Sequence, residues 1–408
     1  MTPSTSIAGS FPVAALRRLL YPLLRFLETA LDALLFGTAS LLRPLQHSTA
    51  QQRTLLLARL DAIGDMVMFS GCLPRYRTLF RGWKIVLLIT DRTAVLVRSV
   101  PWVDEVWVLP RHRYRWNFAE RLRWWNRIRG KRFTLTVNCA YSSSARHLDP
   151  LVGWSLAPRR VAMMCLDLVD GRLRHGMYHT ELVPPGPQWK FETQRNEDLL
   201  HYLGWRGDGS CRPSVFLENP DRVTGDKLRA ACAPKPLAVV VPGAGAPGRM
   251  WPEAKFVQAV RAIDSVDPHC WVLCGNAAEY GLCRRIGEQL RPIKTVNLAG
   301  QTTLPELAGI IAGASCVLAN ETAAVHIAAG TDTPCVCVLG GGFPNRFYPY
   351  PGNPRTRAVT HVLDCYHCYW KCTRRAVECV RDVPVESVVR AFLDLRALFP
   401  VPGGDHSA

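Results

Sequence analysis

Near the middle of the chain stands Leu237-Ala238-Val239-Val240-Val241-Pro242-Gly243-Ala244-Gly245, in which five apolar residues pass directly into a glycine-containing turn. A short, valine-rich apolar run is typical of a strand buried in a parallel sheet. The segment from Leu55 to Gly64 repeats this arrangement in the first half of the chain. Because ligands of open α/β sheets bind outside the carboxyl ends of the strands, we expect the functional site at these two turns.

Short apolar runs rich in β-branched residues recur along both halves of the chain. Helix-like stretches separate them, and this alternation predicts parallel sheets with crossover helices, that is, an α/β fold in each half. The predicted strands are residues 54–58, 85–89, 134–139, 237–241, 271–274, 316–318 and 335–339.

The length of 408 residues exceeds one ordinary hydrophobic core and predicts two domains with additions. The proline-bearing segment at residues 211–220 is the predicted connection between them. We therefore expect an N-terminal extension (1–50), two Rossmann-like domains (51–212 and 213–398) and a short tail (399–408).

The chain is basic, with 50 Lys and Arg against 33 Asp and Glu and a formal net charge of +17. Such a charge predicts an anionic partner: an anionic lipid surface, a phosphorylated glycan, a nucleoside diphosphate or a nucleic acid. We find no helix-turn-helix, zinc-finger or aromatic ribonucleoprotein motif, so a nucleic acid is not expected.

The extension is apolar over residues 12–42, but five charged side chains interrupt it and leave no clean run of about 18 to 20 apolar residues that could span a membrane. A signal peptide is not expected either, since no cleavage sequence is evident. Two interpretations remain, an interfacial helix with arginines on its polar side and a helix packed on the protein itself. The interrupting residues are Arg17, Arg18, Arg25, Glu28 and Asp32.

A second basic segment, residues 111–132, holds nine Lys or Arg and a single acid, Glu120. Tryptophans are interleaved with these charges, a composition that suits an anionic membrane surface or a phosphorylated acceptor. A solvated basic face over an ordinary core contact is the alternative. The helical spacing predicts one apolar face made of Phe118, Leu122, Trp125 and Ile128.

The first turn, residues 58–67, presents Asp65 directly after Gly64, at the beginning of a predicted helix. A carboxylate there can accept the proton of an acceptor hydroxyl as that oxygen attacks a sugar carbon, which is a general-base role. The same position is also that of an ordinary helix cap.

The second turn, residues 241–252, precedes a helix predicted to begin near Pro252. Its small residues would let a diphosphate approach the backbone amides, and Arg249 could neutralise the charge of that group. The turn is not a P-loop, because the Gly-Lys-Ser/Thr ending is missing. A plain surface turn is the alternative.

A third segment, residues 297–350, holds Glu321 directly after a predicted strand and His326 five residues later. A helix beginning near Thr322 would direct its amide end at the same cleft as Gly243 and add a second anion site. A structural core histidine is the alternative for His326.

Together these three segments resemble glycosyltransferase family 9, the bacterial lipopolysaccharide heptosyltransferase family, over most of residues 53–390. The resemblance implies a GT-B fold, in which the first domain receives the acceptor and the second holds a nucleotide sugar across a central cleft. It also implies an inverting displacement, in which the acceptor oxygen attacks the anomeric carbon as the nucleoside diphosphate departs.

The resemblance assigns roles residue by residue. Asp65 matches the family's proposed catalytic residue, Arg249 a basic residue near the donor phosphates, and Glu279 an acid near the ribose. The remaining expected donor-binding residues are Gly243, Ala244, Glu321, Thr322, Ala323 and His326.

Two departures from the family pattern concern the donor. Glu321-Thr322-Ala323 stands where the family carries Asp-Ser/Thr-Gly, and Arg249 replaces the usual Lys. Arginine keeps the charge and changes the geometry of the contact, so both departures bear on the identity of the sugar. No Asp-x-Asp motif stands in a convincing loop, so catalysis is expected to require no metal.

Most of the 15 cysteines lie in apolar runs, where Cys behaves as a small buried hydrophobe, and they predict a reduced, cytosolic interior. These are exemplified by Cys270, Cys274, Cys316, Cys335 and Cys337. Four others gather within fifteen residues, a grouping also seen in many family 9 members, and could hold a structural zinc or iron ion, form disulfides or remain free thiols. They are Cys365, Cys368, Cys372 and Cys379.

We therefore expect an inverting glycosyltransferase that moves a heptose or related sugar from a nucleotide-diphosphate sugar to a lipopolysaccharide or another bacterial surface glycan. The expected location is the cytoplasm, on the inner face of the inner membrane. The alternatives are a protein O-heptosyltransferase, a nucleotide-sugar epimerase of similar architecture and a catalytically silent nucleotide-binding scaffold.

Overall fold

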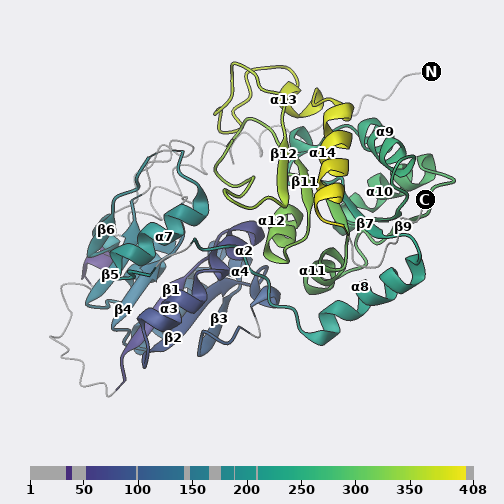
Figure 1. Cartoon of the computed structure of the whole chain (residues 1–408). Helices are drawn as coiled ribbons and strands as arrows, with labels where there is room; N and C mark the ends of the chain where they lie inside the picture. The colour runs from purple at the N-terminus through teal and green to yellow at the C-terminus, as the bar shows by residue number, and fades with distance from the viewer. Residues whose placement is uncertain are drawn as a thin grey trace, which may run out of the picture.

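Two six-stranded parallel sheets form the framework of the protein, one in each half of the chain (Figure 1). The computed structural model describes residues 34–38, 52–97, 100–141, 148–164, 176–187, 189–207 and 210–400. All strand pairings between these residues are parallel. The α/β fold predicted from the alternating pattern is confirmed.

The first sheet has the order β3-β2-β1-β4-β5-β6, and the second has the order β12-β11-β10-β7-β8-β9. The first contains β1 (Thr54–Ala58), β2 (Lys84–Thr90), β3 (Glu105–Leu109), β4 (Leu135–Asn138), β5 (Arg159–Met163) and β6 (Glu181–Val183). The second contains β7 (Leu237–Val241), β8 (Cys270–Leu273), β9 (Thr295–Asn297), β10 (Cys316–Asn320), β11 (Cys335–Val338) and β12 (Thr356–Val359).

In each sheet the strand order reverses direction at the first strand of that half of the chain. The chain runs from β1 outward to β3 and returns to β4 on the other side of β1, and β7 and β10 repeat this arrangement. A crevice at the carboxyl end of the sheet accompanies such a reversal and is the usual ligand site of open α/β sheets. The two glycine-containing turns follow β1 and β7, as expected.

The helices in the first half are α2 (Ile63–Ser70), α3 (Leu73–Leu79), α4 (Arg111–Trp116), α5 (Phe118–Gly130), α6 (Leu148–Gly153) and α7 (Glu192–Tyr202). Those in the second half are α8 (Asn219–Cys232), α9 (Glu253–Asp264), α10 (Tyr280–Gln289), α11 (Leu304–Ala312), α12 (Ala323–Gly330), α13 (Glu378–Arg381) and α14 (Val385–Leu398). One hydrophobic cluster contains residues of both sheets, so the halves share a core. The helices α2 and α12 lie at their junction (Figure 1).

Five strands escaped prediction: β3, β5, β6, β9 and β12. Four of these are the outermost strands of their sheets. An edge strand is partly exposed, so its sequence mixes polar with apolar residues and lacks the continuous apolar run of a central strand.

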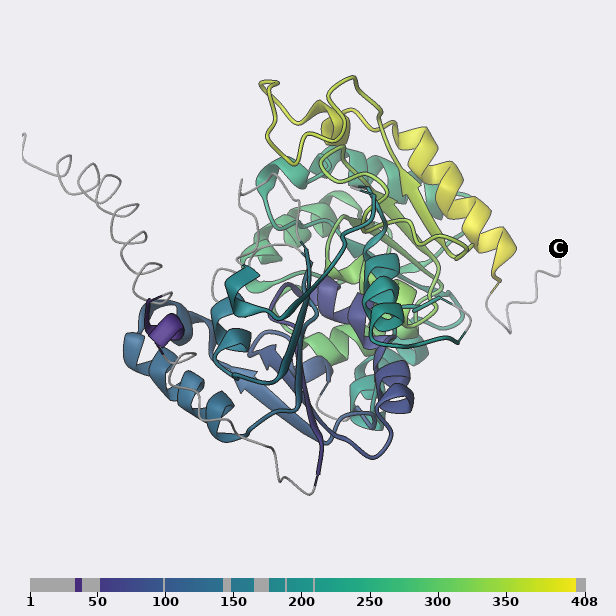
Figure 2. The ribbon, with the colours of Figure 1, turned by 90° about the vertical axis from the view of Figure 1, so that its left-hand side faces the viewer.

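The predicted apolar face of the basic segment is wrong in two of its four positions. Trp125 and Ile128 are buried, but Phe118 and Leu122 remain about 40% and 38% exposed. Trp124 is buried in their place, beside Trp107 of β3. Helix α5, drawn in blue, lies on the outer side of the first half, away from α14 of the second (Figure 2).

The N-terminal extension falls almost wholly outside the described residues. Residues 34–38 are helical, and Phe36 packs against Trp154 and Tyr178 of the first half. No helix in the described ranges is long and apolar enough to cross a membrane.

The cysteine interpretation needs one correction. Cys270 forms a disulfide with Cys232 of α8, so it is not a free thiol. The other four cysteines of the apolar runs are free and buried, as predicted; they are Cys274, Cys316, Cys335 and Cys337.

Candidate active site

The two halves of the site meet where α2 packs on α12. Gly64, in the first turn of α2, touches the imidazole ring of His326 of α12, and a Cβ at position 64 would overlap that ring. Glycine is therefore required at position 64 by this close approach. The contact brings Asp65 and His326, which are 261 positions apart in the sequence, to the same junction.

Asp65 lies in the first turn of α2, as predicted. Its Oδ2 accepts a hydrogen bond from the backbone amide of Ala62 at 3.1 Å, so the side chain caps the helix. Its Oδ1 lies 3.7 Å from the guanidinium of Arg59, and the side chain is 18% exposed. Burial raises the pKa of Asp65 above its ordinary value, while Arg59 opposes the rise. A carboxylate with a raised pKa is a stronger proton acceptor, so the cap and the general-base roles are compatible.

A buried ionic cluster supports Asp65. Arg59 is fully buried, donates from Nε to Asp61 at 2.9 Å and lies 3.2 Å from Glu192 of α7. Its guanidinium also donates to the side chain of Asn196 at 3.1 Å. Burial raises the pKa of Asp61 to about 8, with Arg59 lowering it.

The ionic cluster continues into the second half of the chain. The guanidinium of Arg346 lies 3.6 Å from the carboxylate of Glu192, and the Glu192 amide donates to the Arg346 carbonyl at 2.9 Å. Tyr350 reaches across as well, because its ring packs against Phe191 and its hydroxyl lies 2.6 Å from Nδ1 of His326. Burial lowers the pKa of His326 to about 4, so the ring is neutral at pH 7.

Asn320, the last residue of β10, organises the turn that follows β7. Its side-chain amide donates to the carbonyl of Pro242 at 2.7 Å and accepts from the amide of Trp251 at 3.1 Å. The turn is thereby held at both ends to the carboxyl end of the neighbouring strand. The sequence contained no signal that separated this asparagine from its neighbours.

Glu279 lies against this turn. A Cβ on Gly243 would overlap the Glu279 carboxylate, so only glycine allows the approach. The same carboxylate accepts from the amide of Asn276 at 2.7 Å and caps the short helical turn before α10. The structure thus brings the predicted residues Gly243 and Glu279 together, with Ala244 next along the turn.

Helix α12 begins where the sequence predicted. The hydroxyl of Thr322 caps it by accepting from the amide of Ala324 at 3.3 Å, and Ala323 is its first residue. The amide end of a helix carries a partial positive charge and can attract an anion.

Arg249 and Glu321 form the charged part of the second half of the site. Both are half-buried, and each affects the other electrostatically: burial raises the pKa of Glu321 to about 7, and Arg249 opposes the rise. Among the described residues, neither Nε of Arg249 nor Oε2 of Glu321 has a hydrogen-bond partner. Buried polar atoms normally have partners, so these two are available to a bound ligand.

The four clustered cysteines do not form a metal centre in this structure. The thiol of Cys372 faces backbone carbonyls at 3.7 and 3.8 Å, and Cys379 accepts from the amide of Gly341 at 3.4 Å. Within the described ranges, no group of three or more His, Cys, Asp or Glu side chains could hold a metal ion. The donor set suits zinc or iron. Burial raises the pKa of the Cys379 thiol, and Cys368, Cys365 and Cys372 lie near enough to add to the rise, so a structural metal site at these cysteines stays a prediction.

Comparison with known proteins supports the resemblance. Residues 194–376 match the sequence model of glycosyltransferase family 9 (heptosyltransferase). The chain carries a glycosyltransferase family 9 domain. The predicted resemblance is confirmed, and the protein is a glycosyltransferase.

Similar proteins include lipopolysaccharide heptosyltransferase 2 of Salmonella typhimurium, which is 23% identical over 318 residues, or 75% of this chain and 87% of that protein. A family 9 glycosyl transferase from Veillonella parvula shares the fold with a TM-score of 0.71 and 14% identity, over 85% of this chain and 98% of that one. The E. coli ADP-heptose lipopolysaccharide heptosyltransferase II has a TM-score of 0.63 and 17% identity, over 85% and 99%. The predicted GT-B fold is confirmed by these neighbours.

Proposed function

We propose that this family 9 glycosyltransferase transfers a heptose from a nucleoside diphosphate to the core of a lipopolysaccharide, with inversion at the anomeric carbon. The contact between α2 and α12 carries the proposal, because it sets the raised-pKa carboxylate of Asp65 beside the donor half of the site. The names of the relatives support heptose, lipopolysaccharide and, for the donor, ADP-heptose.

In the proposed reaction the acceptor hydroxyl gives its proton to the Asp65 carboxylate. Its oxygen forms a bond to the anomeric carbon while the bond from that carbon to the diphosphate oxygen breaks. The diphosphate leaves with the electron pair and carries the new negative charge.

The negative charge of the departing diphosphate must be stabilised, and two groups in the second half of the site can stabilise it. Arg249 contributes a positive charge, and the first amides of α12 contribute the positive end of a helix dipole. Glu321 lies beside Arg249, where its carboxyl group could accept a hydrogen bond from a hydroxyl of the donor sugar. Stabilisation of the diphosphate by Arg249 and by the amide end of α12 does not require a metal ion.

A two-step experiment tests this function. Thermal unfolding is first followed with ADP, GDP, UDP and CDP, since a ligand that binds only the folded state raises the midpoint. The protein is then incubated with ADP-heptose and a heptose-deficient lipopolysaccharide core, and the acceptor is analysed by mass spectrometry. We expect stabilisation by ADP and the gain of one heptose. Stabilisation without transfer to this core, but with transfer to a polypeptide, would instead support the protein O-heptosyltransferase.

We further propose that the enzyme works in the cytoplasm, at the inner face of the inner membrane. The support is the exposed surface of α4 and α5, where Trp116 is 55% exposed and follows the exposed Arg113 and Arg115, and where Phe118 and Leu122 are also exposed. Arginines flanking exposed aromatic and aliphatic residues suit an interface that contains anionic lipid.

Replacing the three apolar residues of this surface tests the membrane proposal. The triple variant W116A/F118A/L122A is expected to lower the partitioning of the full chain onto phosphatidylglycerol vesicles by at least about tenfold, because it removes the apolar part of the contact. Co-sedimentation with the vesicles measures it. The control V266A/V362A/L398A removes three apolar residues of the second half that are more exposed than these, and it should have no effect. Equal binding by both variants would exclude α4 and α5 as the membrane surface.

A further inference from the structure

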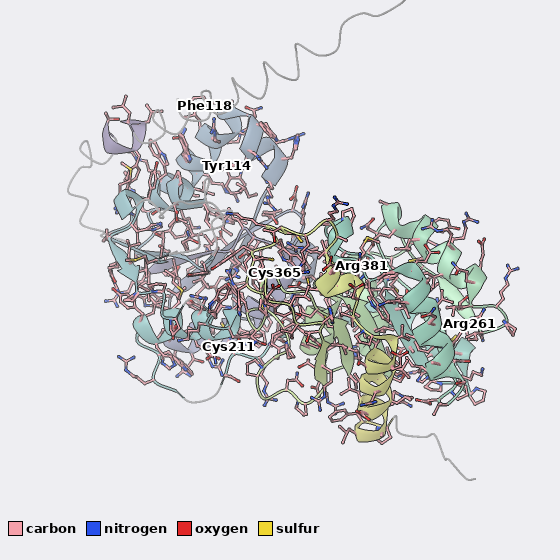
Figure 3. The ribbon with its side chains drawn as sticks, turned by 90° about the horizontal axis from the view of Figure 1, so that it is seen from above. Tyr114, Phe118, Cys211, Arg261, Cys365 and Arg381 are labelled. Carbon is pink, nitrogen blue, oxygen red and sulfur yellow. A yellow bond between two sulfur atoms is a disulfide. The ribbon has the colours of Figure 1, made fainter. Side chains whose placement is uncertain are left out.

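The segment that carries the clustered cysteines also carries three strained aromatic residues. His367, Tyr369 and Trp370 have positive φ values of 68°, 54° and 61°. This conformation costs a residue with a side chain on the order of 1 kcal/mol or more, and it persists only where the surrounding structure imposes it. We call residues 366–370 the aromatic loop. The position of Cys365, which precedes it, is labelled in Figure 3 on the side of the second half that approaches the first.

The glycine run after β11 holds the aromatic loop in place. A Cβ on Gly341 would overlap the ring of Tyr366, and a Cβ on Gly342 would overlap the indole of Trp370. The amides of His367 and Tyr369 donate to the carbonyls of Gly341 and Gly342 at 2.8 and 3.1 Å. These glycines are therefore needed to seat two aromatic rings.

The guanidinium of Arg249 stacks on the Trp370 indole. The guanidinium carbon lies 4.2 Å from the ring centroid, a cation–π arrangement. Among the described residues no ion pair holds Arg249, and its Nε has no hydrogen-bond partner. The indole therefore gives this guanidinium a packing contact in addition to the electrostatic attraction of Glu321.

The first half of the chain supports the aromatic loop from the other end. The ring of Trp189 lies 4.1 Å from that of His367 and 5.3 Å from that of Tyr369, measured between centroids. The loop therefore connects the acceptor half of the protein to the Arg249 side of the donor half.

We propose that Trp370 is a positioning residue for the donor: it holds the Arg249 guanidinium flat against the indole, with its free edge directed to a nucleoside diphosphate. This inference rests on the proposed function and deepens it, because it gives the aromatic loop a part in donor binding. It also accounts for arginine at position 249, since a planar guanidinium stacks on an indole more extensively than the compact ammonium of lysine does.

A double-mutant cycle tests the coupling, with ADP binding measured by titration calorimetry. W370A is expected to weaken ADP binding about tenfold, whereas W370F, which keeps an aromatic face, should stay within about threefold of wild type. In the R249Q background, W370A should change affinity by less than about twofold, because no cation is left to position. A purely structural role for Trp370 would weaken binding equally in both backgrounds.

The outcomes separate this inference from the proposed function. A wild-type protein that binds none of ADP, GDP, UDP and CDP would overturn the proposed donor class. A wild type that binds ADP while W370A binds it equally well would overturn only the role of Trp370. If W370A does not fold, the R249K variant is measured instead. Lysine lacks the planar group that stacks on the indole, so ADP binding should be weakened about tenfold. Wild-type affinity in R249K would overturn the inference.

Discussion

Replacing Asp65 by Asn should lower the rate of sugar transfer by about a hundredfold to ten-thousandfold and leave donor affinity within a few-fold of wild type. The amide keeps the size of the side chain and cannot accept the proton of the acceptor hydroxyl, and this is the range that general-base catalysis usually contributes. Single-turnover transfer from ADP-heptose measures the rate, and titration with ADP measures the affinity.

Asp221 offers a matched control for Asp65. It occupies the same position in the first turn of α8 and accepts from the amide of Glu218 at 3.0 Å, as Asp65 does from Ala62 at 3.1 Å. D221N therefore removes the same charge from an equivalent helix cap, whose bond the amide oxygen can still accept, without a change near the proposed reaction. Equal transfer rates in D65N and D221N would show that Asp65 is a helix cap and not the general base.

Replacing Arg59 by Met is expected to destabilise the protein by about 3 to 5 kcal/mol at pH 8, since it leaves Asp61, Asp65 and Glu192 without their shared buried cation. Urea unfolding followed by circular dichroism measures the loss. The control is R159M, which breaks a surface pair between Arg159, whose side chain is 51% exposed, and Glu181. That variant should lose less than about 1 kcal/mol.

The pH dependence of the Arg59 variant follows from the Asp61 carboxyl. Its folded pKa of about 8 lies above the unfolded value of about 3.9, so wild type loses stability from this group as pH rises between those values. Arg59 lowers this pKa, and removing it raises the folded value further. The variant then continues to lose stability above pH 8, where wild type no longer does. The difference in the free energy of unfolding between wild type and R59M should therefore be larger at pH 9 than at pH 6. A difference that does not change with pH would contradict this account of the cluster.

Local pattern was sufficient for the elements that are buried on all sides. The runs that became β1 and β7 are continuous apolar segments followed by glycine, and both strands are central in their sheets. Thr322 was correctly placed at the start of a helix, because a threonine before a run of alanines is a good cap. The same local reasoning placed the wrong residues on the buried face of α5, where contact with Trp107 made Trp124 an inward residue.

Local sequence patterns did not predict the disulfide either. Cys232 and Cys270 are 38 positions apart, on α8 and at the start of β8, and only the packing of the helix beside the sheet brings them together.

By itself the sequence determined the two α/β halves, the turns that end their first strands and the resemblance to glycosyltransferase family 9. These are properties of short segments, in which the order of apolar residues, glycines and caps carries the information. Only the tertiary structure decided that Gly64 contacts His326, that Arg59 forms ion pairs with three carboxylates and that the guanidinium of Arg249 stacks on Trp370. Each of these contacts joins residues far apart in the chain, and their approach depends on how two sheets and their helices pack, which no local pattern encodes.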